Sequence, residues 1–61
     1  MMTPSTLLAW RSRLGLSQVA AAEALGCSRR ALQQWEAGIN TVPRYIALAA
    51  AAVAFGLPPI E

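Results

Sequence analysis

Histidine, lysine and aspartate are absent from the 61-residue sequence, and cysteine occurs once, at Cys27. General acid-base and nucleophilic catalysis draw mainly on these residue types, so the sequence predicts no enzyme. A lone cysteine without histidine offers too few ligands for a zinc site, and it has no partner for a disulfide within the chain. We therefore expect no metal, no cofactor and no catalytic residue. Cys27 itself is interpreted as a small buried apolar residue rather than a redox sensor.

Long hydrophobic runs are missing as well. The longest one, residues 45–57, is shorter than the about 20 residues that a membrane-spanning helix needs. The sequence also lacks the charged start, apolar middle and small-residue cleavage site of a signal peptide. No pattern typical of a small-molecule pocket is present either. The sequence therefore predicts a cytoplasmic protein with no membrane partner and no small-molecule ligand.

Charged residues make up only 13% of the chain, whereas 56% of the residues are hydrophobic. A single domain of this size supplies only about 3 to 5 kcal/mol of net stability, and its core cannot hide so much apolar surface. Small domains are otherwise stabilised by disulfides, metal ions or self-association. The first two are excluded above, so we expect a homodimer. The formal net charge is +2, and all five basic residues are arginines. Arginine suits guanine edges and phosphates, although a GC-rich gene would favour arginine with no functional meaning.

Apolar residues recur with helical spacing in four segments, and no run alternates as in a strand. Residues that favour helix starts stand at Thr3-Pro4 and Ser17, and a glycine that favours a helix end stands at Gly26. These signals predict helices over about residues 4–14, 18–25, 29–37 and 44–55. The sequence is therefore interpreted as one all-α domain, residues 1–61.

The segment 29–37 has two distinct faces when it is drawn as a helix. One face is apolar, with Ala31, Leu32 and Trp35, and must pack on the rest of the domain. The other face carries long polar side chains and no carboxylate; its members are Arg29, Arg30, Gln33 and Gln34. A solvated surface is the ordinary explanation of such a face. The preceding helix, the turn at Gly26 and this helix instead match the geometry that presents a recognition helix to DNA.

Arg11 lies on the apolar stripe of the first expected helix, beside Leu7 and Leu14. A guanidinium in that position needs an anion, because an unpaired buried charge is costly. The three available carboxylates are Glu23, Glu36 and Glu61. Glu36 is the natural partner, because Glu23 falls on the outer face of its helix and Glu61 lies at the end of the sequence. We interpret the pair of Arg11 and Glu36 as structural.

Several short motifs keep the mutual spacing of a known family. They are Leu14-Gly15-Leu16-Ser17-Gln18, then Ala22 with Leu25-Gly26-Cys27-Ser28, then Trp35-Glu36-Ala37-Gly38, and finally Pro43. Over about residues 3–48 the sequence resembles the lambda repressor and Cro family of helix-turn-helix domains, also called the XRE family. The resemblance implies a compact four-helix domain whose second and third helices form the helix-turn-helix. We expect no fifth helix, which members of the family commonly add.

The resemblance also implies roles for individual residues. Base-reading positions fall on Ser28, Arg29, Arg30, Gln33 and Gln34. Phosphate contacts fall on Ser17, Gln18, Asn40, Thr41 and Arg44, and Gln18 is also expected to brace the recognition helix. The pair of Arg11 and Glu36 matches an internal ion pair of the family's phage repressors. Those repressors often have glutamine at the first two reading positions, where this sequence has arginine. Because arginine prefers guanine, we expect a pseudo-palindromic operator with G in its half-sites.

The fourth segment, residues 44–55, is apolar on nearly all sides. One side can pack on the domain, and the other side has no partner left in the chain. We expect a homodimer interface on that side and in the residues that follow, formed by Tyr45, Ile46, Val53, Phe55, Leu57 and Ile60. An exposed, alanine-rich surface without a partner is the alternative.

Three functions are compatible with these patterns. The first is a homodimer that binds double-stranded DNA at a specific sequence and regulates transcription, as a repressor of phage or mobile-element type that also controls its own gene. The second is an antitoxin or protein-interaction module whose apolar fourth helix binds a partner protein, with DNA binding secondary. The third is an assembly adaptor that does not bind DNA. The first is favoured, because antitoxins usually carry a separate toxin-binding extension and this sequence shows hardly any.

Overall fold

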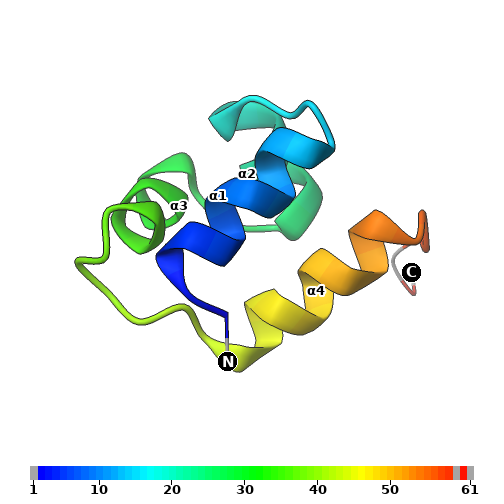
Figure 1. The fold of residues 1–61 in the computed structure, drawn as a ribbon. Helices are drawn as coiled ribbons and strands as arrows, with labels where there is room; N and C mark the ends of the chain where they lie inside the picture. Colours follow the sequence, from blue (N-terminus) through cyan, green and yellow to red (C-terminus); the bar gives the residue numbers. More distant parts are fainter. Residues whose placement is uncertain (1, 59, 61) are drawn as a thin grey trace.

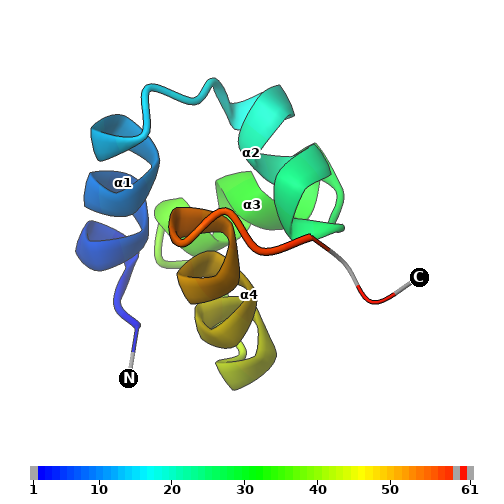
Figure 2. The same ribbon diagram turned by 90° about the vertical axis from the view of Figure 1, so that its right-hand side faces the viewer.

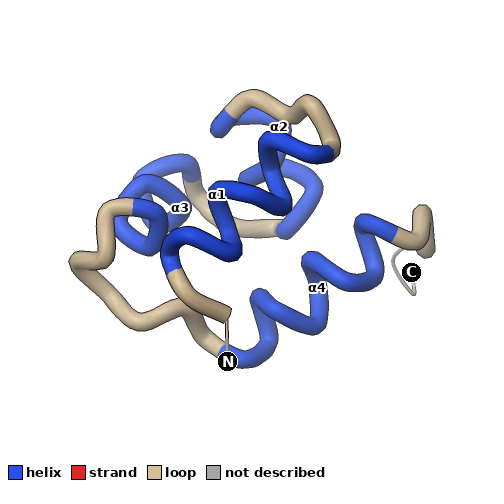
Figure 3. The backbone as a smooth tube through the Cα atoms, viewed as in Figure 1, coloured by secondary structure: helices blue, strands red, loops and turns tan. Residues whose placement is uncertain are grey.

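The fold consists of four α-helices: α1 spans Pro4–Arg13, α2 spans Gln18–Leu25, α3 spans Arg29–Glu36 and α4 spans Arg44–Ala54 (Figure 1). The computed structural model describes residues 2–58 and residue 60, and these residues contain no strand (Figure 3). Met1, Pro59 and Glu61 lie outside the described residues, so the ends of the expected domain 1–61 are not covered. The expected all-α class with four helices is confirmed.

A serine or threonine caps the N-terminus of each of the first three helices. In every case the side-chain oxygen accepts a hydrogen bond of 3.1 Å from the backbone N–H three residues later, in the pairs Thr3 with Thr6, Ser17 with Ala20 and Ser28 with Ala31. Each such cap satisfies one of the free N–H groups of a helix start and contributes about 1 kcal/mol. The caps therefore set where α1, α2 and α3 begin.

Three of the helices end one residue earlier than the sequence predicted. Leu14, Ala37 and Phe55 were expected to be the last helical residues, but they are C-cap residues that follow α1, α3 and α4. Each still has helical dihedral angles, which is why the sequence pattern does not separate it from the helix. The helix α2 ends at Leu25 as expected, and the C-cap residue Gly26 has φ +75°, a left-handed conformation that a side chain would strain.

The core joins all four helices through apolar side chains. Leu7 from α1 and Leu32 from α3 are completely buried and lie at its centre. The other buried members are Ala21, Ala22, Leu25, Trp35, Val42, Ile46 and Ala50. Leu14 was expected on the buried stripe of α1, but it is 37% exposed because it lines an open cleft between α1 and α4.

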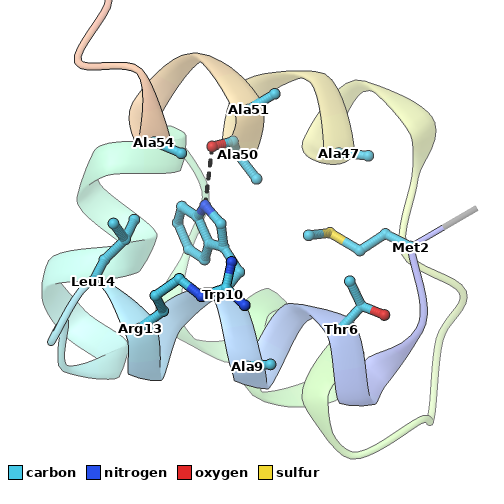
Figure 4. Close-up of a pocket in the computed structure, with 10 residues that line it drawn as sticks. All are labelled: Met2, Thr6, Ala9, Trp10, Arg13, Leu14, Ala47, Ala50, Ala51 and Ala54. Carbon is cyan, nitrogen blue, oxygen red and sulfur yellow. Dashed lines mark hydrogen bonds between the residues drawn. The ribbon is translucent and has the colours of Figure 1, made fainter.

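The helix α4 lies at one edge of the molecule (Figure 1), and Figure 2 shows it beside α1. Side chains of both helices line an open cleft of about 320 Å³. The indole ring of Trp10 enters this cleft from α1, and its Nε1 donates a hydrogen bond of 2.9 Å to the backbone oxygen of Ala50 in α4 (Figure 4). The wall formed by α4 consists of alanines, which leave room for the ring. Trp10 therefore holds α1 and α4 together across the cleft.

At two positions of α4 the observed burial differs from the sequence expectation. Ile46 is only 4% exposed and belongs to the core, so its assignment to a dimer interface was wrong. Val53 is half-buried and packs against the core, so it is not a free surface residue either. Both were misplaced because α4 is apolar all round, and its sequence pattern does not show which side faces inward.

Candidate DNA-binding surface

The helix α3 turns its polar face away from the domain. Leu32 and Trp35 are buried on its inner side, whereas Arg29, Arg30 and Gln33 are exposed on its outer side. Within the part of the chain that the structure describes, neither arginine forms an ion pair. The outer side of α3 thus presents guanidinium and amide groups whose hydrogen-bonding capacity is available to a ligand.

The end of α3 is tied to α1 by an ion pair between Arg11 and Glu36. Nε of Arg11 donates to Oε2 of Glu36 at 2.7 Å, and Nη2 of Arg11 donates to Oε1 at 3.2 Å. The third nitrogen of Arg11, Nη1, donates to the backbone oxygen of Leu16 at 3.1 Å. Glu36 is thereby directed inward, and its charge is compensated within the domain. No carboxylate of α3 opposes an anionic ligand on the outer side.

Gln18, the first residue of α2, extends this network to the outer face of α3. Its Nε2 donates to Oε1 of Glu36 at 3.1 Å, and its Oε1 accepts a hydrogen bond of 3.1 Å from Nε2 of Gln33. A continuous series of side chains therefore runs from Arg11 in α1, through Glu36 and Gln18, to Gln33. The series holds α2 and α3 in a fixed relation.

The loop after α3 is attached to the same helix by a second amide contact. Nδ2 of Asn40 donates to Oε1 of Gln34 at 2.9 Å. Gln34 is half-buried, and Asn40 is exposed. The contact places the loop beside the end of α3. A ligand that contacts Gln34 is therefore also close to Asn40 in the loop.

The arrangement of α2, a sharp turn and an α3 with a free polar face is the geometry of a helix-turn-helix. Residues 5–61 match a family model described as a helix-turn-helix domain. The chain belongs to this helix-turn-helix family. The family is part of the XRE and lambda-repressor-like group, which confirms the resemblance noted in the sequence. Searches of curated proteins and of solved structures found no match.

Membership in the helix-turn-helix family implies DNA as the partner and transcriptional regulation as the class of function. Domains of this family are typically not enzymes. In the described part of the chain no three His, Cys, Asp or Glu residues come close enough to hold a metal ion. None of its helices is long and apolar enough to cross a membrane.

The residues expected to contact DNA phosphates lie at three places of the helix-turn-helix domain. Ser17 is the exposed cap of α2, Thr41 is exposed in the loop after α3, and Arg44 is the exposed first residue of α4. Gln18 and Asn40 make the contacts to Gln33 and Gln34 described above. Ser28, expected to read a base, is exposed at the start of α3. Its side-chain oxygen accepts the capping hydrogen bond, which leaves the hydroxyl proton free to be donated.

Cys27 lies in the turn between the two helices of the motif and is half-buried. Burial raises the pKa of its thiol above the ordinary value, and a backbone hydrogen bond partly offsets this effect. A raised pKa leaves little thiolate at neutral pH, so the turn holds a weakly reactive cysteine.

Two contacts of the helix-turn-helix surface join pairs of residues that the sequence did not predict, although Gln18 was expected to brace α3 without a named partner. These are the amide contacts of Gln33 with Gln18 and of Gln34 with Asn40. The first joins residues on different helices and depends on how α2 and α3 cross. The second had a weak signal, because Asn40 follows α3 closely and an asparagine in such a loop commonly bonds to nearby polar groups.

Proposed function

We propose that this domain binds a pseudo-palindromic DNA operator as a homodimer and represses transcription, including that of its own gene, in the cytoplasm of a bacterium or a phage-infected cell. The observation that carries the proposal is the outer face of α3. Arg29, Arg30 and Gln33 are exposed on it, and the one carboxylate of α3, Glu36, is directed inward to Arg11. A helix with such a face fits the major groove, which is lined by base edges and flanked by phosphates.

The arginines at the start of α3 carry most of the proposed base recognition. A guanidinium can donate two parallel hydrogen bonds to O6 and N7 of guanine, which is the commonest specific contact in the major groove. Arg29 and Arg30 are free to do so, because both are exposed and form no ion pair among the described residues. The operator half-sites are therefore proposed to contain G. The shorter or less exposed side chains Ser28 and Gln34 contact bases beside them.

Phosphate contacts position α3 in the groove. The proposed groups are the cap hydroxyl of Ser17, the second amide proton of Gln18, and the side chains of Asn40, Thr41 and Arg44. They lie at the start of α2, on the loop from α3 to α4 and at the start of α4, so they flank α3 along the chain on both sides. Contacts on two sides of a recognition helix hold it against both strands of the duplex backbone.

A homodimer is proposed to form through the outer side of α4. Leu48 is 61% exposed and Phe55 is 83% exposed, and they lie on one side of the helix because seven residues make about two turns. Tyr45, Leu57 and Ile60 are exposed as well. An apolar strip with a large side chain near each end is self-complementary when two copies run antiparallel, since each Leu48 then faces the partner's Phe55.

The size of the domain suits such a dimer on DNA. The described fold extends over 31 × 22 × 19 Å, and the two recognition helices of a dimer need to lie about 34 Å apart, one turn of the duplex. Two copies joined by α4 are large enough to reach successive major grooves. A dimer bound across a promoter blocks polymerase, which is the basis of the proposed repression.

The proposal is tested by selecting bound duplexes from a random pool at fixed salt concentration, followed by affinity measurement at several salt concentrations. We expect a sequence with two inverted half-sites, each containing G, bound about 10³-fold or more tightly than random DNA. Equal binding to all duplexes would overturn sequence-specific regulation. A single half-site without an inverted repeat would overturn the homodimer and leave DNA binding intact.

A further inference from the structure

We infer that the pocket at the start of α4 receives Phe55 of a second copy of the chain, so that each protomer inserts one phenyl ring into the other. The inference rests on the homodimer of the proposed function and names the site in which its most exposed aromatic side chain binds. It adds a contact outside α4, because residues before α1 and before α4 complete the pocket.

The pocket lies where α4 begins and has a volume of about 430 Å³. Its floor is apolar: Val42 is buried, and Met2 and Ala47 are half-buried. Leu48 and Arg44, which also line it, are exposed, so the pocket opens on the outer side of α4. An arginine at such a rim keeps its charged end in water. The pocket is therefore suited to an apolar group of moderate size.

Phe55 is left in water by the fold although its backbone is fixed. The residue is 83% exposed. Its N–H donates to the backbone oxygen of Ala51 at 3.1 Å, and the N–H of Leu57 donates to that of Ala52 at 2.9 Å. A side chain on an ordered backbone loses less entropy on binding than one on a mobile segment. An apolar cavity of about 150 Å³ is enough for benzene, so the pocket has room for this ring.

The antiparallel pairing of two α4 helices brings the ring to the pocket. With Leu48 opposite the partner's Phe55, the twofold axis passes between Ala51 and Ala52, two small residues that let the helices approach closely. A side chain between packed helices enters a hole lined by residues i, i+3, i+4 and i+7 of the facing helix. The hole opposite the partner's Phe55 is lined by Arg44, Ala47, Leu48 and Ala51, and the first three of these also line the pocket.

The two flanks of Leu48 differ in size. At about 100° per residue, Ala47 lies on one flank and Tyr45 on the other. The pocket is on the flank of the alanine, where a small side chain leaves space. A ring that enters beside Leu48 therefore meets the pocket on one flank and a bulky side chain on the other.

The exposed area at this side of α4 is sufficient for a stable dimer. Tyr45, Leu48, Phe55 and Leu57 are each at least 60% exposed. Together with the residues between them they can remove on the order of 600 Å² per copy from water, or about 1,200 Å² in total, and standard interfaces bury about 1,200 to 2,000 Å². Twofold symmetry makes the contact of ring and pocket occur twice, so one pairing fills both pockets.

The first test labels Phe55 alone, since it is the only phenylalanine of the chain. The full chain is made with 4-fluorophenylalanine, and its fluorine resonance is recorded in H₂O and in D₂O over a dilution series. Sedimentation of the same samples gives the dissociation constant of the dimer. We expect the difference between the two solvents to be present in the monomer and largely lost in the dimer, because the ring has left water.

The second test fills the pocket. Ala47→Met should raise the dissociation constant of the dimer about 10-fold to 100-fold, because the added atoms occupy the space of the partner's ring. Ala54→Met is the matched control and should leave the constant unchanged. Both alanines line the cleft between α1 and α4, but only Ala47 also lines the pocket.

The third test mixes two weakened variants, Ala47→Met and Phe55→Ala. Each should dimerise poorly alone, the first because its pocket is filled and the second because it has no ring to insert. Their heterodimer keeps one open pocket with one phenyl ring, and on its other side the methionine faces an alanine. We therefore expect the equimolar mixture to form a heterodimer that is tighter than either homodimer.

The outcomes separate the inference from the proposed function. A dimer whose labelled ring stays in water, equal effects of Ala47→Met and Ala54→Met, or a mixture without a tighter heterodimer overturns the inference and leaves the homodimer in place. A wild-type chain that is monomeric at every concentration, also on a selected duplex, overturns the homodimer and the inference together, whereas duplex selection still decides DNA binding. Far-ultraviolet circular dichroism of each variant verifies that the helices are intact.

Discussion

Arg11 and Glu36 are joined by two hydrogen bonds between α1 and the end of α3, with Nε to Oε2 at 2.7 Å and Nη2 to Oε1 at 3.2 Å. The side chains are 18% and 8% exposed, so the pair is largely withdrawn from water. Because the same carboxylate also receives Gln18, the pair supports the position of α3 as well as the stability of the fold. Stability and DNA recognition therefore share one carboxylate.

Replacement Glu36→Ala should lower the free energy of unfolding by about 2 to 3 kcal/mol, because it leaves the Arg11 guanidinium without its anion. The value lies below the about 3 to 5 kcal/mol of a fully buried pair, since part of Arg11 remains in contact with water. Urea or thermal unfolding followed by circular dichroism measures the change. Glu23→Ala, at an exposed position of α2, is the control and should change stability by less than about 0.5 kcal/mol. Equal stability of both variants would show that the pair contributes nothing.

Replacement of Arg29 or Arg30 by alanine should cost about 1 to 3 kcal/mol in binding to the selected operator if the side chain is bidentate to guanine. The loss should be confined to one base position, where selectivity relaxes. Arg13→Ala serves as the control, since Arg13 is an exposed arginine on α1 beside the cleft to α4 rather than on α3. Titration of labelled duplexes at fixed salt concentration measures both quantities. A loss of equal size for every duplex would mean that the arginine contacts phosphate only.

Much of the fold could be predicted because local rules and tertiary packing agree. Thr3 and Ser17 cap helices where the sequence places them. The helix α3 has one apolar and one polar face, so only one of its faces can pack against the domain. The pair of Arg11 and Glu36 was foreseeable since a guanidinium on an apolar stripe needs an anion and few carboxylates exist. Such features depend on spacing along one helix or on the scarcity of partners.

The rest depends on how helices cross, which periodicity does not contain. Ile46 and Leu48 are similar apolar residues on α4, yet one is buried and the other is 61% exposed. A helix that is apolar on all sides offers no signal for this choice. The contact of Gln18 with Gln33 likewise depends on the packing of α2 against α3, which brings Nε2 of Gln33 within 3.1 Å of Oε1 of Gln18. The face of α4 and the orientation of the Gln33 amide therefore became visible only in the structure.

The thiol of Cys27 should react more slowly than a free thiol with a disulfide reagent at pH 7 to 8. Burial raises its pKa, so the fraction of thiolate at these pH values is smaller than for an ordinary cysteine with a pKa of about 8.5. The rate should rise with pH and should continue to rise above pH 8.5. The chain unfolded in urea is the control and should react at the rate of a free thiol. Equal rates in the folded and unfolded states would show that the fold does not protect Cys27.

Replacement Phe55→Glu should convert the proposed homodimer into a monomer while the fold remains intact. Phe55 is 83% exposed, so a carboxylate there costs the monomer little, whereas in the dimer it would be buried against the partner's Leu48 without a cation. Sedimentation measures the mass, and circular dichroism verifies the helices. Val19→Glu, at a half-exposed apolar position on α2, is the control and should leave the dimer unchanged. A dimer that survives Phe55→Glu would move the interface away from this side of α4. A wild-type chain that is monomeric at every concentration, also on DNA, would instead favour a different protein as the partner of α4.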